Sequence, residues 1–201
     1  MTEEKHISEL TDENSFWKLY KLTRKIPTSK DNLYVYWLFF SLFILIAPLS
    51  TATLDLKLES FAVNVKDLIG WSISILGFIL AGYSIFASLT DKSLQLKLAS
   101  AIEPKTKLNL LKHTHCLFVK VLIELIIMVF LAYILKVIFS KEVILPLIDI
   151  MGIQDSIASM AISFIDAVIS SLFVMMLLLC KSFIYNVYHV IMVSIRWHAQ
   201  K

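Results

Sequence analysis

The sequence is poor in the residues that build loops and disulfide frameworks. Its 201 residues include four glycines, four prolines and two cysteines. So few glycines and prolines leave little room for long turns, and most of the chain must therefore lie in regular secondary structure. The cysteines, Cys116 and Cys180, fall near helix ends that the topology below places in the cytosol. Thiols stay reduced there, so we expect no disulfide.

Charged residues are also scarce. They make up 17% of the chain, whereas roughly a quarter of a soluble domain is charged, and hydrophobic residues make up 58%. The apolar residues occur in continuous runs instead of alternating with polar ones, which favours helices over a β-barrel in a bilayer. The sequence therefore predicts an all-α, polytopic membrane protein in contact with lipid.

Catalytic and ligand-binding motifs are missing as well. The chain has no phosphate-binding loop, dinucleotide fingerprint, nucleophile motif or pair of carboxylates in an aqueous domain. We therefore expect neither an enzyme nor a cofactor. His113, His115 and Cys116 lie close together, but the two histidines do not share a helix face and no second cluster supplies further ligands, so we expect no metal site. The net charge of +3 gives no reason to expect direct nucleic-acid binding.

Four segments are long and apolar enough to cross a hydrocarbon core of about 30 Å, which needs about 20 residues. They are residues 33–53, 68–89, 117–139 and 157–180. We expect a four-helix membrane domain over residues 32–180, with a short external loop at 55–66 and an apolar outer loop at 141–155 against the membrane interface. A polar segment, 1–31, precedes this domain, and a helix, 181–201, follows it.

The distribution of basic residues predicts the orientation, because lysine and arginine favour the cytosolic side. A four-span topology with both termini inside leaves only four of the 19 basic residues outside, namely Lys57, Lys66, Lys136 and Lys141. We therefore expect a multi-pass membrane protein with its N- and C-termini in the cytosol. The competing topology makes 182–196 a fifth span, but this segment is short and has a polar side.

Two cytosolic segments have helical patterns. Residues 15–26 combine apolar positions (Phe16, Leu19, Tyr20 and Ile26) with basic ones, with Ser15 as the N-cap and Pro27 after the end. This pattern is typical of a basic interfacial helix, and an ordinary positive-inside flank explains it nearly as well. In the second segment, 90–116, we expect the second and third spans to continue as a helical hairpin that turns near Glu103 and Pro104.

An acidic stretch precedes the basic helix. It contains Glu3, Glu4, Glu9, Asp12 and Glu13. Anionic lipid repels such a segment, so it is free for contact with a protein.

Two acids interrupt the spans. An ionised carboxylate at bilayer depth costs several kcal/mol, so Glu124 and Asp166 should face other helices or water. Glu124 has Lys120 one turn away, which favours a structural ion pair. Asp166 has only Ser163 and Ser170 about one turn to either side, so a packing role and a place in the polar lining of a pore or cavity stay open.

Small residues gather in the second span. Gly70, Gly77, Ala81 and Gly82 would let another helix approach closely, and Gly77 with Ala81 forms a small-xxx-small pair. We predict that they mark a packing face, used within one chain or between subunits.

The stretch 77–92 (GFILAGYSIFASLTDK) resembles segments of small bacterial membrane proteins, including the membrane subunits of anti-phage defence systems such as Kiwa and the membrane effectors of some retrons. Such proteins oligomerise, work with a cytosolic partner, and sense or breach the membrane. The resemblance implies an oligomeric subunit of a bacterial defence or stress system, located in the inner (plasma) membrane. It assigns no functional residue. The alternatives are a membrane immunity protein against a pore-forming bacteriocin and a passive anchor for a cytosolic enzyme.

Overall fold

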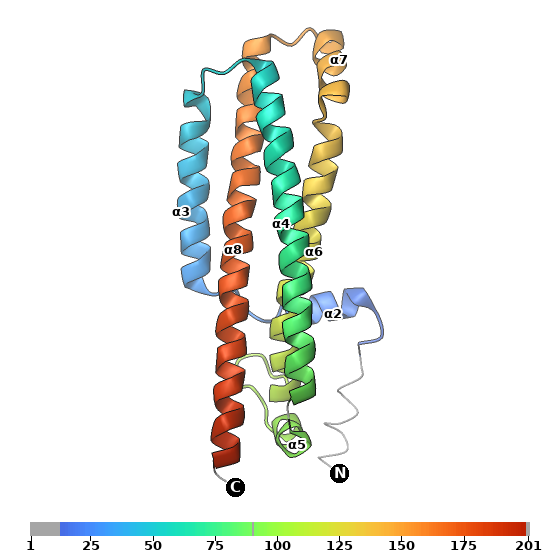
Figure 1. Cartoon of the computed structure of the whole chain (residues 1–201), viewed down its shortest axis with the longest axis vertical. Helices are drawn as coiled ribbons and strands as arrows, with labels where there is room; N and C mark the ends of the chain where they lie inside the picture. Colours follow the sequence, from blue (N-terminus) through green and yellow to red (C-terminus); the bar gives the residue numbers. More distant parts are fainter. Residues whose placement is uncertain (1–12, 90, 200–201) are drawn as a thin grey trace. The chain divides into compact units, whose positions relative to one another are not determined.

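The computed structural model describes residues 13–89 and 91–199 (Figure 1). The acidic residues Glu3, Glu4, Glu9 and Asp12 lie outside this range, so the predicted protein contact of that stretch stays a prediction. The described residues form seven α-helices and one 3₁₀ helix: α2 (Phe16–Thr23), α3 (Lys30–Ile46), η2 (Ala47–Leu49), α4 (Leu54–Leu89), α5 (Lys92–Ser100), α6 (Leu110–Ile138), α7 (Lys141–Met151) and α8 (Asp155–Ala199).

The all-α fold class is confirmed. Four stretches are long and apolar enough to span a membrane: α3 with η2, α4, α6 and α8. They are apolar on the outside too, with exposed side chains such as Trp37, Phe78, Phe130 and Leu177. A surface of this kind suits lipid, and the chain is a multi-span helical membrane protein by length and hydropathy.

The expected external loop at 55–66 is wrong, because α4 begins at Leu54 and includes it. The segment is helical because its apolar residues have a helical spacing, which the charged residues between them make hard to recognise. Leu58, Phe61, Val65 and Leu68 recur at spacings of three and four residues and are all buried. The first span lies a few residues earlier than expected, at Lys30–Leu49, since α3 begins at Lys30 and η2 ends at Leu49.

The cytosolic hairpin is also partly corrected. Its turn lies near Pro104 as predicted, where Ile102 and Asn109 form an isolated bridge and Lys107 has a positive φ of 60°. The second span does not continue unbroken into it. Asp91 caps a separate helix, α5, through a hydrogen bond from the backbone N–H of Ser93 at 3.0 Å.

Residues beyond Cys180 continue the fourth span directly. The 45-residue helix α8 has no break near residue 181, so 182–196 does not form a separate fifth span. The expected outer loop contains helix α7, which Gly152 ends with a φ of 61°. Lys141, at the start of α7, pairs with Asp55 at 3.0 Å. The hydrogen bond to Asp55 and the charge of that carboxylate raise the pKa of Lys141.

The chain divides into two compact units. The first contains the chain up to Thr28, Gly77–Glu124 and the chain from Cys180 onward; the second contains Ser29–Leu76 and Leu125–Leu179. In the first unit α2 packs on α6, where Leu22, Ile26 and Cys116 form a small buried cluster. Phe16 on the apolar face of α2 is exposed, whereas Leu22, Thr23 and Ile26 are buried.

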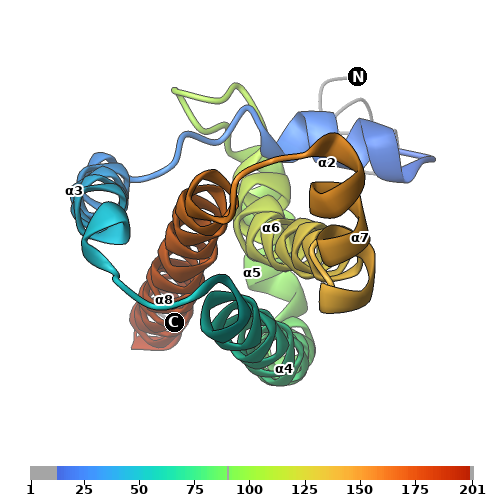
Figure 2. The same cartoon turned by 90° about the horizontal axis from the view of Figure 1, so that it is seen from above.

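In the second unit, α4, α6 and α8 form the core and α3 lies on the side of α8 (Figure 2). α4 and α8 run parallel. Lys57 contacts Ser159 and Asn64 contacts Asp166, and both pairs are separated by 102 residues. α3 is attached by the side chain of Asn32, its single buried residue, which donates a hydrogen bond to the carbonyl of Leu178 at 3.3 Å.

Candidate functional site

The side chain of Asp166 bonds to an amide from a distant part of the chain. Asn64 Nδ2, on α4, donates a hydrogen bond to Asp166 Oδ1, on α8, at 2.8 Å. Both side chains are half-buried. Since a polar group between apolar helices needs a partner, this bond links the two helices at this level.

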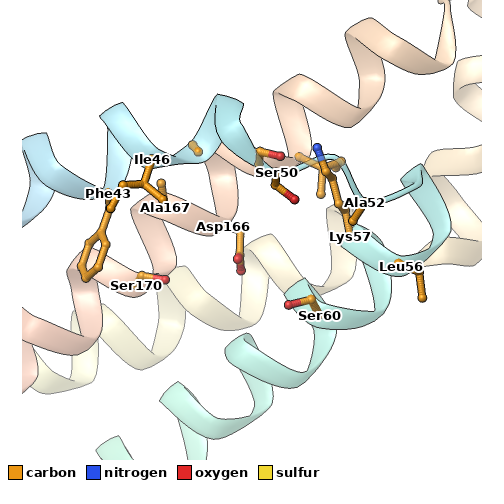
Figure 3. Close-up of a pocket in the computed structure, with 13 residues that line it drawn as sticks. Phe43, Ile46, Ser50, Ala52, Leu56, Lys57, Ser60, Asp166, Ala167 and Ser170 are labelled. Carbon is orange, nitrogen blue, oxygen red and sulfur yellow. The ribbon is translucent and has the colours of Figure 1, made fainter.

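A pocket of about 280 Å³ opens beside this pair. Its lining comes from the end of α3 with the segment after it, from the start of α4 and from α8. Polar side chains gather there, namely Ser50, Lys57, Ser60, Ser163, Asp166 and Ser170. Figure 3 shows the Asp166 carboxylate between Ser60 and Ser170, with Lys57 and Ser50 together at the other end.

The elements around the pocket explain its shape. α3 ends at Ile46, and Pro48 lies in the 3₁₀ turn that follows, so the backbone leaves the helix beside the pocket. Lys57 Nζ reaches across from α4 and donates to the carbonyl of Ser159 at 3.4 Å. The pocket therefore combines a cation, a carboxylate and hydroxyls with an apolar wall of Phe43 and Ile46.

This arrangement offers groups that can bind a ligand. Asp166 Oδ2 has no hydrogen bond to any of the described residues, and no buried polar side-chain atom among them lacks a partner, so this oxygen is accessible. An accessible carboxylate oxygen beside hydroxyls accepts hydrogen bonds from water, an ammonium group or a hydrated cation.

Sequence reasoning found Asp166 but missed Asn64. A signal was present, because Asn64 lies among Phe61, Val65 and Leu68, which form the buried face of α4. A polar residue on such a face needs a partner. Because residues 55–66 were expected to form an external loop, Asn64 was not considered as part of a buried helix face.

Lys120 and Glu124 lie in the first unit. Lys120 Nζ is 3.8 Å from Glu124 Oε1, a long ion pair. The shorter bonds of Lys120 go to the segment after α2: Nζ donates to the carbonyl of Ile26 at 2.8 Å and to Thr28 Oγ1 at 3.0 Å. Lys120 therefore ties the end of α2 to α6 as well as facing Glu124.

The four small residues of the second span do not share one role. Gly82 packs against Phe183, and a Cβ at position 82 would lie 2.9 Å from the ring. Gly70 and Gly77 have open space around them, and Ala81 is exposed. Within one chain, Gly82 alone of the four takes part in close helix packing.

The histidines have separate partners. His113 Nδ1 lies 3.2 Å from Thr106 Oγ1, and His115 Nδ1 lies 2.9 Å from the hydroxyl of Tyr83. Cys116 is buried against α2 as a free thiol. Across residues 13–89 and 91–199, no group of three or more His, Cys, Asp or Glu side chains comes together that could hold a metal ion.

Comparison with protein-family models, with curated proteins and with solved structures finds no match to this chain.

Proposed function

We propose that the chain is a non-enzymatic, oligomeric subunit of a bacterial inner membrane that acts in a defence or stress system. In this proposal it senses a perturbation of the membrane at the Asp166 pocket and couples to a cytosolic partner. The observation that carries the proposal is the pocket itself, in which a hydrogen-bonded carboxylate meets the end of a lipid-facing helix. A passive anchor has no need of such a site.

The attachment of α3 supports sensing over permeation. Only 6% of the apolar stretch of α3 is buried within the chain, so lipid would surround most of it. The same helix supplies Phe43 and Ile46 to the pocket. A change in bilayer thickness or tension that moves α3 would therefore alter the surroundings of Asp166. Asp166 faces this pocket inside its own unit, which disfavours a place in the wall of a pore between subunits.

The end of α8 supports a partner. Beyond Cys180 it exposes a run of apolar side chains, namely Ile184, Tyr185, Tyr188, Ile191, Met192 and Ile195. Trp197 at its end contacts α5, with Lys97 Nζ 4.5 Å from the centre of the indole ring. An apolar surface of this extent on a cytosolic helix would need a protein cover.

The topology behind this proposal is testable at the linkers. Reporter fusions after residue 30, near 104 and after 201 should report the cytosol. Insertions at 50–53 and 152–154, which connect η2 to α4 and α7 to α8, should report the outside. An external C-terminus would rule out a cytosolic partner for α8.

Sensing is tested by expressing the chain in bacterial cells that carry a voltage dye and applying hypo-osmotic shock or a protonophore. The unsubstituted chain should change the depolarisation or co-purify a soluble protein after the stress. Asp166→Leu should abolish that response, and Asp166→Asn should keep assembly but reduce it. Asp155→Asn, an exposed acid at the start of α8, is the matched control. Cells that respond like empty-vector cells under both stresses would refute the proposal.

The same preparations separate the alternatives. A monomeric mass in detergent favours an immunity protein. A passive anchor is favoured if the chain forms an oligomer that binds one soluble protein with or without stress, and if Asp166→Leu does not change that binding.

A further inference from the structure

Two charged residues of α4 are exposed in the second unit with no partner. Lys66 and Asp67 point away from the core, and neither forms an ion pair with any residue that the structure describes. At about 100° of rotation per residue, the buried residues Phe61, Val65 and Leu68 lie on the side of α4 opposite to the two charges. Asn64, which bonds to Asp166, lies at the edge of that buried side, about 160° from Lys66 and about 60° from Asp67.

The depth of these charges makes their exposure costly. The carbonyl of Leu178 on α8 accepts the hydrogen bond from Asn32, and Leu178 lies twelve residues beyond Asp166, or about 18 Å along the helix at 1.5 Å per residue. Asn64 is level with Asp166, and Lys66 and Asp67 follow it by two and three residues toward the level of Asn32. The two charges therefore lie about 14 Å from the level of Asn32 along the helix axis. At that level α3 exposes Phe39 and Leu42 to lipid. Charges at hydrocarbon depth require water or a protein partner.

The residues around the two charges leave room for another helix. With about 100° of rotation per residue, Val63, Gly70 and Ser74 lie in the middle of the exposed face and Lys66 and Asp67 lie on its opposite edges. Gly70 has nothing within 4 Å of a Cβ position. The Ser74 hydroxyl donates to the Gly70 carbonyl at 2.9 Å, so it needs no outside acceptor. A helix backbone can therefore approach closely here.

We propose that this face of α4 packs against the same face of a second copy, so that Lys66 of each copy pairs with Asp67 of the other. Insertion in one orientation makes all copies parallel, so equal residues lie at equal depth. In a two-fold parallel pair, the edge of one helix that carries Lys66 meets the edge of its partner that carries Asp67, as in the flanking charge pairs of coiled coils. The same face on two copies therefore brings opposite charges together at nearly the same depth in the membrane.

This inference rests on the oligomer of the proposed function and names its interface. It assigns the open space at Gly70 to contact between subunits. It also explains why a membrane helix exposes a lysine and an acid side by side: each has its counter-charge on the neighbouring copy, and the pair is satisfied only in the assembly.

The test uses the full chain in detergent, with mass measured by light scattering over a dilution series. Lys66→Asp and Asp67→Lys should each weaken association about tenfold or more, since like charges then meet. The double swap, Lys66→Asp with Asp67→Lys, should restore it. Glu142→Lys, an exposed charge reversal on α7, should leave the mass unchanged.

Cysteine cross-linking in membranes provides a second measurement that changes no charge. Gly70→Cys should form a disulfide-linked dimer under mild oxidation. Ala62→Cys, which is also exposed but lies about 80° away from Gly70 on α4, should not. The unsubstituted chain, with Cys116 and Cys180, gives the background.

The outcomes separate this interface from the proposed function. An oligomer whose mass ignores both single substitutions, or equal cross-linking at positions 62 and 70, overturns the interface and leaves sensing intact. Swap rescue together with an inert Asp166 supports the interface and removes the sensing proposal. A monomeric unsubstituted chain overturns both.

Discussion

The two units satisfy their polar groups in different ways. In the first unit, Lys120 bonds to a backbone carbonyl and a hydroxyl beside α2, and aromatic rings fill the space between helices. In the second unit, a side-chain amide bonds to a carboxylate at the edge of a pocket. The first unit thus pairs its lysine with groups of the same unit, whereas the second keeps an accessible carboxylate oxygen beside a pocket.

The largest effect is expected from a substitution that leaves a cavity in the aromatic packing of the first unit. Phe183 is 3% exposed and contacts Phe78 and Phe118. Phe183→Ala should lower the free energy of unfolding by about 3–5 kcal/mol, because it leaves a cavity beside Gly82. Thermal unfolding in detergent measures this. Ile184→Ala, at an exposed neighbour, is the control, and an equal loss at both positions would contradict tight packing at Phe183.

A smaller effect is expected at the hydrogen bond of the second unit. Asp166→Leu should cost about 1–3 kcal/mol of unfolding free energy, because Asn64 then loses its partner. Asn64→Leu in the same background should cost much less than it does alone. A double-mutant cycle in detergent measures the coupling, which for helices in membranes averages about 0.6 kcal/mol and reaches about 1.7 kcal/mol. Strict additivity would show that the two side chains do not interact.

The polar contacts of the first unit can be separated in turn. Lys120→Met should release the segment after α2 and cost about 1–2 kcal/mol, since it removes two hydrogen bonds. Glu124→Gln should cost less than about 1 kcal/mol, because the ion pair is long. Hydrogen exchange at residues 22–26 reports the release. Faster exchange in Glu124→Gln than in Lys120→Met would show that the ion pair with Glu124 matters more than the hydrogen bonds of Lys120.

The smallest expected effect compares two glycines of α4. Gly82→Ala should cost about 1 kcal/mol, because the Phe183 ring must shift. Gly77→Ala should stabilise the chain by about 0.4–1 kcal/mol, since nothing lies near it and alanine favours helix. Melting temperatures of the two variants should therefore change in opposite directions. A loss of stability at both positions would mean that Gly77 also packs closely.

Long apolar runs determine most of the fold, and this part could be predicted from the sequence. Four spans follow from run length alone, and Ser15 was predicted as the N-cap of α2 because its hydroxyl can accept the N–H of Lys18. What could not be predicted depends on contacts between distant segments. The charges at 55–66 suggested a loop, whereas the buried side of α4 decides its structure. The partner of Asp166 lies 102 residues away, and no local spacing identifies it.

The parallel register of α4 and α8 has a consequence for movement along their axes. Ser163 and Ser170 flank Asp166 about one turn to either side, and each hydroxyl oxygen can accept a hydrogen bond. A slide of α8 by one turn, about 5.4 Å, would carry Asn64 from Asp166 to one of these serines instead of leaving it unsatisfied. Hydrogen bonding thus favours a few discrete registers of the helix pair. Disulfide trapping of a cysteine at position 64 with one at 163, 166 or 170 would show which register is occupied before and after stress.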